Sequence, residues 1–178
     1  MKASYKVSLG GIIGALSISL MLLTSIVPFG TFAFPAFAGM LLVCVVVELG
    51  FSWAFVVYSV VSALSLLFLT DKEAALYYVI FLGFYPIVKG MIEKIRSKIV
   101  QYVIKYALFN ICIVSAFYIS IFVLSIPKES FTVFDVYLPW AFLVAGNVVF
   151  LFYDYCVSRI VTLYLLKIRS IITKNTKM

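Results

Sequence analysis

Long and nearly uncharged apolar runs dominate this sequence and limit what it can fold into. A bilayer core about 30 Å thick needs about 20 helical residues to cross it. That length, applied along the chain, predicts six spans, at residues 7–27, 32–49, 51–69, 74–92, 102–126 and 134–166. A membrane barrel would alternate polar and apolar positions, and these runs do not alternate. We therefore predict an all-α integral membrane protein with six transmembrane helices in one compact bundle.

The composition also indicates that lipid is the main solvent. Of the 178 residues, 65% are hydrophobic and 12% are charged, against roughly 45–50% and about 25% in a soluble domain. A chain this short could not bury so much apolar surface in water. Because no linker, repeat or low-complexity tract divides the chain, residues 1–178 are predicted to form a single transmembrane domain.

Two places inside the apolar runs carry turn or kink chemistry. Residues 31–70 contain no Lys or Arg and are about twice too long for one span, so we predict a tight hairpin at Glu48-Leu49-Gly50, where the only turn chemistry of this stretch lies. In the fourth span, Pro86 removes a backbone donor and frees the carbonyl of Leu82. A kink is therefore predicted between Gly83 and Gly90.

Basic residues predict the orientation, because Lys and Arg in short loops mark the cytoplasmic side. Only Lys72 and Lys128 fall on one side. Nine fall on the other: Lys2, Lys6, Lys94, Arg96, Lys98, Lys167, Arg169, Lys174 and Lys177. We predict that both termini are cytoplasmic in a multi-pass protein of the plasma membrane, of the bacterial cytoplasmic type. The net charge of +7 suits anionic membrane lipid, and nucleic acid is not expected as a partner because no soluble domain is predicted.

Five ionisable residues lie within the predicted spans and close to their cytoplasmic ends: Glu48, Lys89, Lys105, Asp154 and Arg159. Charges at this depth are expected to reach the headgroups or to pair with one another. Glu93 follows Lys89 by four residues and is a local partner for it, and Glu48 is expected to pair with Lys89 or Arg159. No carboxylate lies at mid-depth, which disfavours an ion pump or a secondary transporter.

Several kinds of catalytic site lack their parts in this sequence. There is no His, and the three Cys show no paired spacing, so zinc, haem and Ser-His-Asp sites are not expected. Paired acids and a Ser beside a base are also missing, which disfavours an intramembrane enzyme. We predict that the chain is not an enzyme and holds no cofactor or metal.

Small residues open the first span, at Gly10, Gly11, Gly14 and Ala15. Small residues four apart on a helix let a second helix backbone approach closely. The approaching helix can belong to this chain or to a separate membrane subunit, and the pattern leaves both alternatives open.

Polar and aromatic residues mark two further spans. Asn110 and Asn147 need hydrogen-bond partners in hydrocarbon and are expected to point inward, either to pair between helices or to contact a solute. In the fourth span, Tyr78, Phe81 and Tyr85 lie on one face together with Lys89. This aromatic stripe fits either a core or a pocket.

The layout resembles that of the S components of energy-coupling factor transporters, the membrane subunits that bind the substrate. The shared features are six spans, both ends inside, a small-residue face on the first helix and an outer loop rich in Phe, Pro and Gly, over residues 7 to about 166. The resemblance implies uptake of a vitamin or similar small molecule with a separate transmembrane coupling subunit and ATPases. It also implies that Gly10, Gly11, Gly14 and Ala15 dock onto the coupling subunit.

The resemblance further implies a pocket that opens outward, between the first outer loop and the later helices. It would involve Phe29, Thr31, Phe32, Tyr77, Tyr78, Tyr118, Tyr137, Trp140 and Asn147. The chain departs from the family in having Gly in place of the usual alanines and few polar groups in its outer half. No vitamin-specific signature is present. The alternative is a membrane scaffold similar to rod-shape-determining proteins, which have a similar length and span count and bind no solute.

Overall fold

Nearly all of the described chain is helical. The structure is a computed structural model that describes residues 3–27, 30–123, 132–133, 136–137 and 139–168. Its helices are α1 (Ala3–Leu23), α2 (Ala33–Leu49), α3 (Phe51–Phe68), α4 (Lys72–Tyr77), the π-helix η1 (Tyr78–Leu82), α5 (Tyr85–Ile92), α6 (Lys98–Phe122), α7 (Pro139–Leu163) and the π-helix η3 (Tyr164–Ile168). The two-residue strands β1 (Thr132–Val133) and β2 (Val136–Tyr137) pair antiparallel.

The helices are long and apolar, as the sequence predicts. Five helical stretches are long and apolar enough to cross a membrane: Ala3–Leu23, Phe51–Phe68, Lys72–Ile92, Lys98–Phe122 and Leu143–Leu166. The helix α2 is equally apolar but shorter, at 17 residues. Large apolar side chains such as Val7, Leu67 and Phe152 are exposed on the outer faces. The prediction of an all-α protein with long apolar helices is therefore confirmed, apart from the short strand pair.

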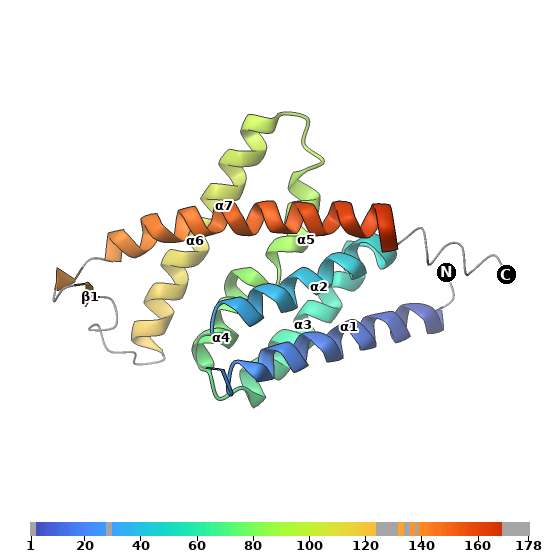
Figure 1. Cartoon of the computed structure of the whole chain (residues 1–178), viewed down its shortest axis with the longest axis horizontal. Helices are drawn as coiled ribbons and strands as arrows, with labels where there is room; N and C mark the ends of the chain where they lie inside the picture. Colours follow the sequence, from blue (N-terminus) through green and yellow to red (C-terminus); the bar gives the residue numbers. More distant parts are fainter. Residues whose placement is uncertain (1–2, 28–29, 124–131, 134–135, 138, 169–178) are drawn as a thin grey trace.

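The helices α1, α2 and α3 pack side by side (Figure 1). A Cβ built on Gly10 would lie 3.3 Å from Val57 of α3, and one on Gly14 would lie 3.7 Å from the same side chain. Ser17 of α1 donates a hydrogen bond to the backbone oxygen of Ala38 in α2, at 3.3 Å. Small residues thus hold α1 against its neighbours at close range.

The turn between α2 and α3 is at Gly50, the last residue of the predicted segment, while Glu48 and Leu49 still belong to α2. Its φ of 88° is a backbone conformation that Gly adopts without steric cost. Its amide donates to the backbone oxygen of Val46 at 3.1 Å, and its carbonyl accepts from the amide of Ala54 at 3.2 Å. One residue therefore ends α2 and begins α3.

The segments α4, η1 and α5 form one interrupted helix over residues 72–92, which we call the bent span. Pro86 lies in the first turn of α5, and the break falls at Gly83 and Phe84, at the start of the predicted kink region. The carbonyl of Leu82, which Pro86 was expected to free, accepts a hydrogen bond from the Tyr153 hydroxyl of α7 at 2.9 Å. On the other side, the Tyr58 hydroxyl of α3 donates to the carbonyl of Val79 at 2.6 Å.

The helix α2 passes very close to this break. A Cβ on Gly39 would lie 2.0 Å from the Leu82 carbonyl oxygen and 3.2 Å from the Tyr153 hydroxyl. Only glycine leaves room for this contact, so Gly39 sets the distance between α2 and the bent span.

An aromatic core joins the bent span to α6 and α7. Phe109 and Phe150 stack with ring centroids 4.7 Å apart, and Phe81 stacks on Tyr85 at 4.8 Å. Tyr78, Phe81 and Tyr85 are all buried. The aromatic stripe of the fourth span is therefore core packing, one of the two alternatives that the sequence left open.

The beginning of α1 and the end of α7 lie at the same end of the molecule, on the right in Figure 1. The turn from α2 into α3 is at that end as well, whereas α4 begins at the opposite side of the view.

Candidate functional site

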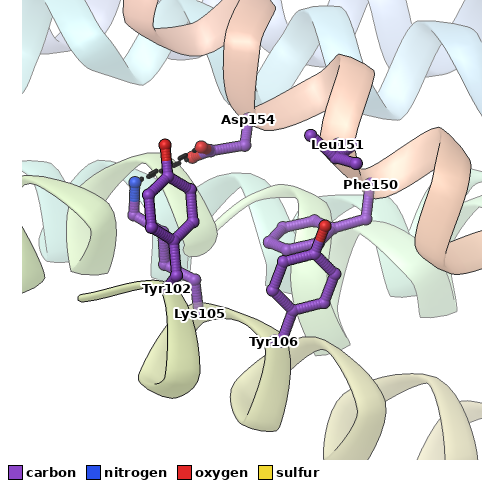
Figure 2. Close-up of a pocket in the computed structure, with 6 residues that line it drawn as sticks. All are labelled: Tyr102, Lys105, Tyr106, Phe150, Leu151 and Asp154. Carbon is purple, nitrogen blue, oxygen red and sulfur yellow. Dashed lines mark hydrogen bonds and ion pairs between the residues drawn. The ribbon is translucent and has the colours of Figure 1, made fainter. Parts of the chain in front are cut away.

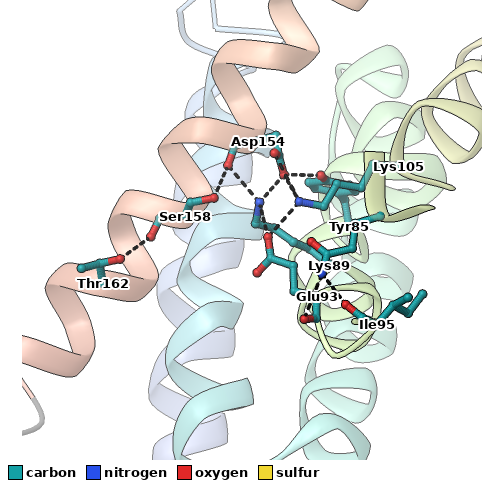
Figure 3. Close-up of polar contacts among 9 residues, drawn as sticks. Tyr85, Lys89, Glu93, Ile95, Lys105, Asp154, Ser158 and Thr162 are labelled. Atoms are coloured by element: carbon teal, nitrogen blue, oxygen red, sulfur yellow. Dashed lines mark hydrogen bonds and ion pairs between the residues drawn. The ribbon is translucent and has the colours of Figure 1, made fainter. Parts of the chain in front are cut away.

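Four charged side chains meet where α5, α6 and α7 come together (Figure 3). We call Lys89, Glu93, Lys105 and Asp154 the charge cluster. Lys89 is 1% exposed and Lys105 is 4% exposed. Charges buried inside membrane helices are costly and commonly mark functional sites, so this cluster is the first candidate site of the protein.

Asp154 is the centre of the charge cluster. Its carboxylate accepts hydrogen bonds from the ammonium of Lys89, from that of Lys105 at 3.1 and 3.3 Å, and from the Tyr85 hydroxyl at 2.5 Å. Its backbone oxygen accepts from Lys89 at 3.1 Å and from the Ser158 hydroxyl at 3.0 Å. One residue of α7 thereby binds both α5 and α6.

Glu93, just after α5, is the second acceptor. It lies 2.8 Å from the Lys105 nitrogen and 3.0 Å from that of Lys89. Burial raises the pKa of Glu93, but the hydrogen bonds from Lys105 and Lys89 outweigh burial and hold this pKa below its ordinary value. Two ammonium groups therefore face two carboxylates, and the formal charges cancel.

The sequence predicted that these charges pair with one another, and the local pair of Lys89 with Glu93 is present. Of the two interhelical partners predicted for Glu48, Lys89 was wrong, because Lys89 pairs with Asp154. Glu48 accepts from the Tyr164 hydroxyl at 3.3 Å, and Arg159 donates to the Tyr155 hydroxyl at 2.7 Å.

A small cavity adjoins the charge cluster between α6 and α7 (Figure 2). Its volume is about 10 Å³, roughly the space that one water molecule needs. It is lined by Tyr102, Lys105, Tyr106, Phe150, Leu151 and Asp154. This cavity is too small for a vitamin-sized molecule.

Three of the predicted solute residues come together at the start of the bent span, away from the charge cluster. The Thr31 hydroxyl donates to the Asp71 carboxylate at 2.9 Å, and the other oxygen of Asp71 caps α4 by accepting from the amide of Ala74 at 3.0 Å. The rings of Phe32 and Tyr77 lie 4.8 Å apart, and Phe32 is 62% exposed. We call Thr31, Phe32 and Tyr77 the loop contact.

Two of the other predicted solute residues, Tyr78 and Tyr118, make different contacts. Tyr78 is buried beside Tyr58, at 6.0 Å between ring centroids, and so belongs to the core. Tyr118 is exposed and stacks on Phe122 at 6.2 Å. Phe29 and the side chains of Tyr137 and Trp140 lie outside the residues that the structure describes.

Asn147 forms a reciprocal pair with Asn110. Each amide nitrogen donates to the other side chain's oxygen at 3.0 Å. The same nitrogens also donate to backbone oxygens, that of Asn110 to Tyr106 at 2.8 Å and that of Asn147 to Leu143 at 2.9 Å. Both amides are used in joining α6 to α7, which favours the helix-pairing alternative for Asn147 over solute contact.

The predicted docking residues of α1 divide into two faces. Gly10 and Gly14 contact α3, which is the same-chain alternative. Gly11 and Ala15 are exposed, and a Cβ on Gly11 would meet no atom within 4 Å. Successive helical residues are rotated by about 100°, so neighbouring small residues point in different directions.

No group of three His, Cys, Asp or Glu side chains that could hold a metal ion occurs in the described part of the chain. Comparisons with protein-family models, curated proteins and solved structures find no match to the chain.

Proposed function

We propose that this chain is the substrate-binding S component of an uptake transporter of the energy-coupling factor type. In this role it captures a vitamin or similar small molecule and works with a separate coupling subunit and ATPases. The proposal is carried by the outward face of α1, where Gly11 and Ala15 leave the backbone open. Small residues facing outward let another membrane helix approach at backbone distance, and α3 already occupies the Gly10 and Gly14 face.

The proposal includes six membrane spans and places both termini in the cytoplasm. The shorter helix α2 is counted as a span in addition to the five long helical stretches. The apolar composition of α2 and the Gly50 hairpin support a sixth span. In this orientation the connection between α5 and α6 lies inside and the Asp71 turn lies outside, which fits the distribution of basic residues.

Cysteine labelling tests this topology. Lys72→Cys and Arg96→Cys are introduced separately into a chain in which Cys44, Cys112 and Cys156 are replaced by Ala. We expect a membrane-impermeant maleimide added to intact cells to label position 72, and to label position 96 only after permeabilisation, because the two lie at opposite membrane faces. Labelling of position 96 in intact cells would contradict the proposed orientation.

The solute is proposed to bind at the loop contact. Phe32 and Tyr77 offer aromatic rings, one of them largely exposed, beside the polar pair of Thr31 and Asp71. Rings of this kind bury apolar or aromatic ligands, while the polar groups can orient them. In the proposed topology this contact is on the outer side, where a solute arrives.

Two matched substitutions test the docking face. Ala15→Leu and Ala63→Leu add the same three carbons at exposed positions of α1 and α3. We expect the tagged wild type and Ala63→Leu to co-purify from native membranes with ATP-hydrolysing subunits. Ala15→Leu should lose them by roughly 5- to 150-fold, because forcing a packed helix away costs about 1–3 kcal/mol. The melting temperature of the purified chain should not change, since no part of its own packing is altered.

Two results would contradict the proposal. One is equal recovery of the ATPase subunits with both variants, because the α1 face would then not be the docking face. The other is a purified protein that carries no solute by native mass spectrometry and co-purifies with cell-shape proteins, which would favour the scaffold alternative.

A further inference from the structure

The connection between α5 and α6, residues 93–97, stands clear of α7 at the top of Figure 1. Its shape is fixed by Gln101, a buried residue whose side-chain nitrogen donates to the backbone oxygens of Ile95 at 2.6 Å and Glu93 at 3.3 Å. Every residue from 93 to 100 is exposed. We call residues 93–100 the basic hairpin.

The basic hairpin carries three cations and one acid, and that acid is already engaged. Lys94, Arg96 and Lys98 are exposed, and the Lys94 ammonium lies 4.4 Å from the centre of the Phe51 ring. Glu93 directs its carboxylate to the two buried lysines of the charge cluster. The positive charge at the tip is therefore not balanced by the hairpin's own acid.

Exposed apolar side chains lie next to these cations in the chain. Ile99 is 77% exposed, and Ile95, Val100 and Val103 are exposed as well. Cations beside exposed aliphatic groups match the boundary between lipid headgroups and acyl chains. A soluble anion would use the charges and leave the aliphatic groups in water.

The cavity between α6 and α7 is lined by residues of α6 that follow the hairpin in the chain (Figure 2). Tyr102 and Leu151, on its two walls, are 54% and 53% exposed. Tyr106 packs edge-on against Phe150, with 5.3 Å between ring centroids. Lys98, Tyr102 and Tyr106 are spaced four residues apart and so share one face of α6. Lys98, one of the three cations of the hairpin, is thereby aligned with Tyr102 and Tyr106 along α6.

We propose that the basic hairpin and the adjoining walls of α6 and α7 bind one molecule of an anionic phospholipid. Arg96 and Lys98 donate hydrogen bonds to the headgroup phosphate, and an acyl chain lies along Tyr102 and Leu151. The charge excess selects an anionic lipid over a zwitterionic one. The site depends only on the location of the chain in a membrane and not on the proposed uptake function.

The test is lipid titration of the purified full chain, followed by native mass spectrometry. Phosphatidylglycerol and phosphatidylcholine with the same acyl chains are compared. We expect one phosphatidylglycerol to be retained per chain at concentrations at which phosphatidylcholine is lost. Each Lys or Arg near an anionic headgroup contributes roughly fivefold, so the double variant Arg96→Gln with Lys98→Gln should weaken phosphatidylglycerol retention by about 25-fold.

Two further variants distinguish binding at this site from non-specific attraction of anionic lipid to the positively charged protein. Lys72→Gln with Lys128→Gln removes the same charge elsewhere and should leave retention unchanged. Leu151→Gln keeps the charge and removes an apolar wall, and it should weaken phosphatidylglycerol several-fold. Equal retention of the two lipids, or equal losses in the two double variants, would overturn the proposal. Displacement of the lipid by millimolar inorganic phosphate would show a simple anion site. If phosphatidylglycerol does not bind and a co-purified protein shields Arg96→Cys from labelling, the surface is a protein interface.

Discussion

Replacing Asp154 with Leu is expected to lower the free energy of unfolding by about 3–5 kcal/mol, because removing one partner of a buried ion pair leaves uncompensated charge. In Asp154→Leu, the ammonium groups of Lys89 and Lys105 share Glu93 alone, and the Tyr85 hydroxyl loses its acceptor. Denaturant unfolding of the purified chain in detergent micelles measures the change.

A compensating variant distinguishes charge balance from lost packing. Asp154→Leu with Lys89→Met removes one charge of each sign, so the remaining Lys105 still pairs with Glu93. We expect this double variant to regain most of the lost stability, since buried ion pairs can often be replaced by apolar residues of similar size. If the single variant is as stable as the wild type, the cluster is solvated and does not hold the three helices together.

Gly39→Ala is expected to lower the free energy of unfolding by about 3 kcal/mol, the upper part of the range for an overpacked core. The added methyl group would lie 2.0 Å from the Leu82 carbonyl oxygen, which is backbone and cannot rotate away. Either α2 or the bent span must shift, and the Tyr153 hydrogen bond to the same carbonyl is strained. Denaturant unfolding in detergent again gives the value.

Gly11→Ala is the matched control, because it adds the same methyl group in a helix where nothing lies within 4 Å. It should raise stability slightly, by about 0.5–1 kcal/mol, since Ala favours the helix over Gly. We therefore expect Gly39→Ala to lower the free energy of unfolding and Gly11→Ala to raise it. If Gly39→Ala is also stabilised, the Leu82 carbonyl must lie farther from Gly39 than in this structure, where an added Cβ would be 2.0 Å from its oxygen.

The helices could be predicted from composition and length. In lipid, a long apolar run has few other ways to hydrogen-bond its backbone N–H and C=O groups. The Gly50 turn and the free Leu82 carbonyl also followed, since both depend on the local chemistry of Gly and Pro. The start of α6 was placed too late. Lys98 and Gln101 look like loop residues in sequence, but Gln101 is buried and bonds the preceding turn.

The site was less predictable, because it depends on how helices far apart in sequence are rotated against one another. Asp154 was recognised as a charge inside a span, but nothing in the sequence places it opposite Lys89 and Lys105. Thr31, Phe32 and Tyr77 were named only through the family resemblance, and their role in binding a solute stays a prediction. Tyr78, one residue farther, lies in the core, because one helical residue turns the side chain by about 100°.

Two consecutive residues of α7 hold the bent span on either side of Pro86. Tyr153 binds the carbonyl at the break, and Asp154 binds Tyr85 and Lys89 beyond it. A rotation or slide of α7 would break both attachments at once, so α7 and α5 behave as one mechanical body. The half before Gly83 is held as well, by the Tyr58 hydroxyl at Val79 and by the packing of Phe81 on Phe150 of α7, so we expect a shift of α7 to disturb both halves of the bent span.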